Sequence, residues 1–147
     1  MKRVLILCAE NSARSQMAEG LLRHDAGDLY EVCSAGSEPS RVRPQAVQVM
    51  GELGIDISAH RSKPVAEFSG QEFDYVITVC NSAKESCPFF PAKTQRIHWS
   101  VEDPAAVQGS DEERLAAFRR VRDELRRHLQ AFVKEAGNGC GQGSNQE

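Results

Sequence analysis

The chain has 147 residues, a length that fits one domain able to bury a substantial core. Its formal net charge of -3, spread over interspersed acidic and basic residues, excludes a basic nucleic-acid surface, and no apolar run reaches the length of a membrane span. We therefore expect a cytoplasmic protein with no nucleic-acid or membrane partner. Its five cysteines then indicate redox or nucleophilic chemistry, because that compartment keeps thiols reduced.

Short β-rich runs alternate with helical patterns along the chain. Strands are predicted at 3–8, 30–35, 74–80 and 95–99. Runs this apolar are typical of parallel sheets, which are buried on both faces. We therefore expect an α/β fold, a small doubly wound four-stranded parallel sheet with helices on both faces, with ligands beyond the carboxyl ends of its strands.

Helical spacing fills the segments between these strands. One helix is predicted in 12–26, and a second in 44–54 that ends at Gly54. The last helix begins with a capping box formed by Ser110 and Glu113. An apolar stripe follows it and is expected to pack on the core: Leu115, Phe118, Val121, Leu125, Leu129 and Phe132.

The end of the chain differs in composition from the rest. The segment "GNGCGQGSNQE" is rich in glycine and polar residues, which do not favour a packed structure. We assign 1–137 to a single domain and expect 138–147 to form a flexible tail. Cys140 is then an exposed thiol without a catalytic role.

The first predicted strand ends at Cys8, and a loop of small and polar residues leads from it into a helix. Such a loop turns backbone N–H groups inward, and the helix dipole adds positive charge, so it predicts an oxyanion cradle. The planar guanidinium of Arg14 can grip two oxygens of a tetrahedral anion. We assign oxyanion binding to Ala9, Glu10, Asn11, Ser12, Ala13, Arg14 and Ser15.

The same positive field favours the thiolate form of Cys8 and so predicts a nucleophile. A buried core cysteine that ends an apolar strand is the alternative interpretation. The orientation of the Glu10 side chain stays open: a carboxylate beside an anion site is repulsive unless it points to water, and an inward orientation would weaken the assignment of an anionic substrate.

Asp103 follows the fourth strand in the short loop "SVEDPAA". This loop can bring the carboxyl group of Asp103 to the carboxyl ends of the strands, where a ligand is expected. There it can protonate a leaving oxygen, which predicts a general acid. A simple Asp-Pro turn with Pro104 is the alternative.

These motifs resemble the low-molecular-weight protein tyrosine phosphatase superfamily, through "CAENSARS", the chain length and the "DP" loop. The resemblance covers roughly Met1 to Gly137. Within the superfamily, "NSARSQMAEG", "SAGSEP", "DISAHRS" and "HWSVEDPA" are more similar to the thiol-dependent, thioredoxin-coupled arsenate reductases. The resemblance implies that the protein reduces arsenate to arsenite as part of arsenic detoxification, and that Asn11 shapes the loop through its side-chain amide.

Cys80 ends the third predicted strand, and Cys87 lies seven positions later. In the reductases that this sequence resembles, a pair at this spacing carries the reducing equivalents. The resemblance therefore implies a relay of Cys8, Cys80 and Cys87 with thioredoxin as the reductant. A zinc site is disfavoured because C-x6-C is wider than a zinc knuckle, and we expect no metal and no cofactor.

Two other functions stay open at this point. A low-molecular-weight protein tyrosine phosphatase would need only Cys8, Arg14 and Asp103, although Ala105 and Ala106 offer no ring to stack on a phosphotyrosine. A non-catalytic anion-binding module would need none of these to react. In each case we expect a monomer.

The resemblance also concerns a cation site. Some of these reductases bind potassium beside the anion loop through an Asn, a Glu, a Ser and a further carboxylate. Asn11, Glu19 and Ser34 match the first three, whereas Lys63 stands in place of the acid. We expect the Lys63 ammonium to occupy the space of the cation and to pair with Glu19, offering donors to Asn11 and Ser34.

Two further residues have more modest expectations. His60, in "SAHRS", either braces the anion loop or packs. Cys33, inside the second predicted strand, is expected to be a core residue.

Overall fold

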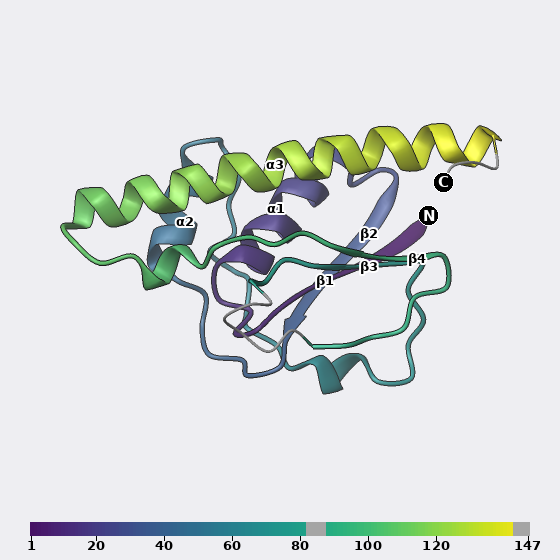
Figure 1. Ribbon diagram of the computed structural model, residues 1–147, viewed down its shortest axis with the longest axis horizontal. Coiled ribbons are helices and arrows are strands. Elements are labelled where there is room, and N and C mark those ends of the chain that lie inside the picture. Colours follow the sequence, from purple (N-terminus) through teal and green to yellow (C-terminus); the bar gives the residue numbers. More distant parts are fainter. Residues whose placement is uncertain (82–87, 143–147) are drawn as a thin grey trace.

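A computed structural model of the chain describes residues 1–81 and 88–142. Four parallel strands form one sheet in the order β2-β1-β3-β4 (Figure 1). The strands are β1 (Lys2–Cys8), β2 (Tyr30–Gly36), β3 (Tyr75–Thr78) and β4 (Gln95–His98). The predicted α/β fold is confirmed, and the strand order reverses between β1 and β3, where doubly wound sheets bind ligands.

Three helices cover one face of the sheet, namely α1 (Arg14–Ala26), α2 (Pro44–Gly51) and α3 (Asp111–Gln142). The other face is covered by the short 3-10 helix η1 (Val65–Phe68) and by loops that contribute Phe73 and Phe90. Helical segments therefore lie on both faces, with most of the helix on one.

Strand β1 supplies both cores because successive side chains of a strand point to opposite faces. Val4, Ile6 and Cys8 pack toward the three helices, whereas Leu5 and Leu7 pack toward η1. All five are almost completely buried. This explains why the run is continuously apolar rather than alternating.

The sequence predicts the start of α3 correctly but places the end of α2 three residues too late. The capping box before α3 is confirmed: the Glu113 N–H donates to Ser110 Oγ (3.1 Å), and the Ser110 N–H donates to Glu113 Oε1 (2.9 Å). Helix α2, in contrast, ends at Gly51 rather than Gly54. Gly54 lies in the following turn at φ 78°, a conformation that suits glycine.

Helix α3 continues to Gln142, past Gly137, where the sequence predicts the tail to begin. Extending a helix that is already formed adds one hydrogen bond per residue and avoids the cost of nucleation, so glycines alone do not end it. The domain boundary and the flexibility of 138–147 stay predictions. Within the part of the chain that the structure describes, no helix combines the length and hydropathy needed to cross a bilayer.

The strand register places the carboxyl ends of β1, β2 and β3 side by side, where the sequence predicts the ligand site. Cys8 pairs with Gly36 of β2, and Leu7 pairs with Thr78 of β3. A side chain at Gly36 would lie 2.6 Å from the Ala9 carbonyl oxygen and 2.8 Å from the Asn11 nitrogen. The loop after β1 therefore crosses so close to β2 that only glycine fits there.

Replacing Gly36 with alanine should lower the free energy of unfolding by about 1–3 kcal/mol, because backbone atoms of the loop must move to admit the methyl group. Urea denaturation measures this. Gly51→Ala is the matched control, since nothing lies within 4 Å of its added methyl group and alanine is the better helix former. Equal stability of the two variants would contradict the close approach.

Candidate active site

The loop after Cys8 directs its carbonyl groups outward. The carbonyl oxygens of residues 9–12 all accept hydrogen bonds, from the Glu38, Ser40 and Arg43 amides and from the Ser62 and Gln16 side chains. The N–H of a trans peptide points away from its C=O, so the loop N–H groups turn inward. Helix α1 begins directly afterwards without a side-chain cap, and its first N–H groups add to this cradle.

Cys8 lies at the centre of this cradle as a free thiol that is 2 % exposed. The Asn11 N–H donates to its Sγ (3.2 Å), and Ser15 Oγ lies 2.9 Å from it. Ser15 Oγ already accepts from Asn11 Nδ2 (2.7 Å), so its own hydroxyl proton is free to donate to the sulfur. The sulfur that the sequence predicts to be the nucleophile is therefore held between a backbone N–H and a hydroxyl group.

Asn11 holds the loop from inside. It is fully buried and adopts φ 51°, a left-handed conformation that asparagine tolerates. Its Oδ1 accepts from the Lys63 backbone N–H (2.8 Å) and from Gln16 Nε2 (2.9 Å). A backbone N–H can only donate, which fixes the orientation of the amide, so Nδ2 donates to Ser15 and Ser34 (3.0 Å).

A second amide, Gln16, extends the network outward, and no sequence pattern marks it. Its Nε2 donates to the Asn11 and Arg61 carbonyls, and its Oε1 accepts from His60 Nδ1 (3.1 Å). Arg23 donates to His60 Nε2 (3.2 Å), so the neutral ring carries its proton on Nδ1. Burial lowers the pKa of His60, against the effect of Glu19. His60 therefore braces the loop through Gln16.

Arg14 and Asp103 meet across the site. Arg14 is 3 % exposed, donates to the Val101 carbonyl (2.9 Å) through Nη1, and places Nη2 3.9 Å from Asp103 Oδ2. Asp103 is half-buried and accepts from the Ala105 N–H (2.9 Å), at the start of the 3-10 helix η2 (Pro104–Ala106). The predicted acid loop thus returns to the cradle, and it also forms the turn that was the alternative.

Cys80 is completely buried, belongs to the same core cluster as Cys8, and is disulfide-bonded. The next residue, Asn81, donates from Nδ2 to the Glu102 carboxylate, beside Asp103. This contact between the third-strand end and the acid loop was not predicted, because nothing in the sequence relates two polar residues in separate loops. Cys87 lies outside the described residues.

Two other expectations concern carboxylate and thiol positions around the loop. The Glu10 side chain points outward, with Oε1 3.6 Å from Arg43 Nη2 and 3.3 Å from Ser40 Oγ, so only its backbone serves the cradle. Burial raises the pKa of the Cys33 thiol, and the Glu19 carboxylate adds to this effect. Cys33 is half-buried and packs against the second core. Cys140 belongs to α3, and the prediction that its thiol is exposed stays a prediction.

Lys63 and Glu19 form the expected pair beside the loop. The ammonium lies 3.9 Å from Glu19 Oε1, and the Lys63 side chain is 12 % exposed. The ammonium donates to the Arg61 carbonyl (3.0 Å), whereas the expected donation to Asn11 comes instead from the Lys63 backbone N–H. Ser34 Oγ donates to Glu19 Oε1 (2.5 Å). Burial lowers the pKa of Lys63, and the Glu19 carboxylate opposes this shift.

Comparison with known proteins gives consistent matches. The family model described as low molecular weight phosphotyrosine protein phosphatase matches residues 3–139. An arsenate reductase of Halalkalibacterium halodurans is 44% identical over 133 residues, which cover 90% of this chain and 96% of that protein.

Solved structures agree with the sequence matches. An arsenate reductase in the phosphate binding state superposes with a TM-score of 0.78 at 34% identity, covering 92% of this chain and 98% of that one. The thioredoxin-dependent arsenate reductase of Corynebacterium glutamicum gives a TM-score of 0.61 at 31% identity, covering 89% of this chain and 63% of that one.

The pairing of Lys63 with Glu19 predicts a protein whose stability does not depend on potassium. Replacing potassium with a large organic cation at fixed ionic strength should leave the free energy of unfolding unchanged. Lys63→Asp should then make stability depend on potassium and, without it, lower the free energy of unfolding by about 1–3 kcal/mol, because a partly buried carboxylate lacks its partner. Urea denaturation in the two salts tests both statements. Potassium stimulation of the unmodified protein would contradict the pairing.

Proposed function

Because this chain belongs to the low molecular weight phosphotyrosine protein phosphatase family, and within it is similar to arsenate reductases, we propose that it reduces arsenate to arsenite by a three-cysteine relay. One observation supports a relay of cysteines. Cys8, the nucleophile, is a free thiol, while Cys80, after the adjacent strand, is disulfide-bonded. A phosphatase has no need of a second oxidisable cysteine beside its nucleophile.

The first step uses the groups that hold Cys8. The loop amides and the Arg14 guanidinium bind arsenate and neutralise its charge, and the Cys8 thiolate attacks the arsenic atom. Asp103 protonates the departing oxygen, which leaves as water. The contact between Asp103 and Arg14 (3.9 Å) supports this role, since it places the carboxyl group beside the guanidinium that we propose binds the anion.

The second step reduces arsenic. The Cys80 thiolate attacks the Cys8 sulfur, and the electron pair of the sulfur–arsenic bond remains on arsenic, which leaves as arsenite. A Cys8–Cys80 disulfide forms. Cys87 then attacks Cys80, which releases Cys8 as a thiolate and leaves a Cys80–Cys87 disulfide. A free Cys8 together with a bonded Cys80 is the state that this last exchange produces.

An external dithiol must return two electrons to this disulfide. Thioredoxin is the reductant we propose, in a cytoplasmic setting, and the thioredoxin-dependent reductase of C. glutamicum supports that choice. Steady arsenite formation with thioredoxin, thioredoxin reductase and NADPH tests the function as a whole. Hydrolysis of phosphate esters without any NADPH consumption on arsenate would favour the phosphatase alternative.

Cys8→Ser should abolish arsenate reduction, because an alkoxide cannot replace a thiolate that must itself be oxidised. Arsenite release in the coupled assay measures this. Cys33→Ser is the matched control and should keep the activity, since Cys33 lies outside the site. Appreciable turnover by the Cys8 variant would refute the mechanism.

Cys87→Ser should release about one arsenite per enzyme and then stop, because nothing can resolve the Cys8–Cys80 disulfide. Mass mapping of peptides after exposure to arsenate detects that bond. The Cys140→Ser variant should turn over normally under the same conditions. Multiple turnovers by the Cys87 variant would remove this residue from the relay.

A further inference from the structure

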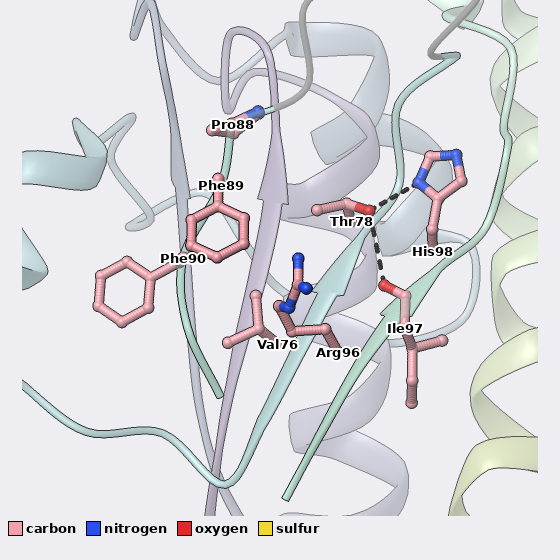
Figure 2. A pocket seen from close by; sticks show the side chains of 8 residues that line it. All are labelled: Val76, Thr78, Pro88, Phe89, Phe90, Arg96, Ile97 and His98. Carbon is pink, nitrogen blue, oxygen red and sulfur yellow. Dashed lines mark hydrogen bonds between the residues drawn. The ribbon is translucent and has the colours of Figure 1, made fainter. Parts of the chain in front are cut away.

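A pocket of about 240 Å³ lies beside strands β3 and β4, and none of the cradle residues 8–15 lines it (Figure 2). Strands β3 and β4 form its floor through Val76, Thr78, Arg96 and His98, and the chain after residue 87 contributes Pro88, Phe89 and Phe90. None of these residues serves the chemistry proposed above. The pocket is therefore a feature that the mechanism leaves unexplained.

Phe89 is exposed to solvent, although phenylalanine side chains are usually buried. Its side chain is 66 % exposed, while the neighbouring Phe90 is buried against Phe73 at a ring distance of 5.8 Å. The Cζ atom of the Arg96 guanidinium lies over the Phe89 ring, 4.4 Å from its centroid; Figure 2 labels both side chains. Within the described ranges, Phe89 is the only aromatic among the exposed large apolar side chains. An aromatic ring held open to solvent beside a pocket is typical of a protein interface.

The position of Cys80 determines from where a reductant must approach. Its sulfur is completely buried, so a large dithiol protein has to attack the other sulfur of the disulfide. Under the proposed function that sulfur belongs to Cys87, whose Cα lies about 3.8 Å from that of Pro88 by covalent geometry alone. Phe89 is one residue further. Any protein that reaches this sulfur therefore also reaches the pocket.

The size of protein interfaces makes this contact unavoidable. A protein–protein interface covers about 800 Å² on each partner, and even weak redox encounters cover several hundred. A patch of that area centred near Pro88 extends about 16 Å in each direction, which includes the Phe89 ring and Arg96. The Arg96 guanidinium also carries several N–H donors, which a carboxylate on a partner can accept.

We propose that this pocket, with Phe89 and Arg96 at its rim, is the docking surface for the protein dithiol that reduces the disulfide. The partner presents an apolar surface around its exposed thiol, which covers the Phe89 ring, and a carboxylate that faces Arg96. Its thiolate attacks the Cys87 sulfur, and Cys80 leaves as a thiolate. The partner's second thiol then displaces Cys87, so the partner is oxidised to a disulfide while Cys80 and Cys87 are reduced to thiols. This inference rests on the proposed function.

The test compares a protein reductant with a small one. Phe89→Ser should raise the KM for thioredoxin about tenfold, and Arg96→Ala several-fold, at an unchanged kcat. Turnover supported by dithiothreitol, which needs no docking surface, should stay within twofold of the unmodified protein. Added salt should raise the thioredoxin KM of the unmodified protein more than that of Arg96→Ala, because screening weakens a charge pair.

Leu29→Ser is the matched control. Leu29 is also an exposed apolar residue (53 %), but it precedes β2, at the opposite end of the strands. It should leave both assays unchanged. Thioredoxin KM values within twofold of the unmodified protein in the Phe89 and Arg96 variants would overturn the docking surface, and so would equal losses with both reductants. Failure of the unmodified protein to form arsenite with either reductant would instead refute the proposed function, before any variant is compared.

Discussion

The buried amide of Asn11 is the contact on which the site depends. It uses all four of its hydrogen-bonding positions, with partners from α1, from β2 and from the backbone at Lys63. One side chain therefore fixes the distances among three segments of the chain. Leaving any of these buried partners unpaired costs about 1–3 kcal/mol, so the loop is held in shape before an anion arrives. A preorganised cradle of this kind stabilises charge without first reorganising.

The parallel sheet supplies the second cysteine. Leu7 of β1 pairs with Thr78 of β3, and the chain continues from these residues to Cys8 and to Cys80. Both side chains belong to one buried cluster. Under the proposed function, phosphatase chemistry would need Cys8, Arg14 and Asp103. Reduction would also need Cys80 and Cys87, which lie beyond the end of β3.

The loop that carries Asp103 is bound by one residue of α1 and by one residue that follows β3. Arg14 binds it at the Val101 carbonyl, and Asn81 binds it at the Glu102 carboxylate. The residue between these contacts and Pro104 is Asp103. Arg14 in the cradle and Asn81, which follows the disulfide-bonded Cys80, are therefore connected through one short loop.

The sequence by itself determined what depends on neighbouring residues: the alternating elements, the capping box before α3, and the cysteine–arginine loop after an apolar strand. Hydrophobic periodicity and spacing reveal these features because they act within one or two turns of the chain. Tertiary structure alone decided the contacts of Gln16 and the hydrogen bond between Asn81 and Glu102. It also decided how closely the loop after β1 approaches Gly36 and that Phe89 is exposed. The Arg14–Val101 bond, for example, joins residues 87 positions apart. Such contacts follow from how the strands are ordered and which side chains that order buries together, and no local pattern carries that information.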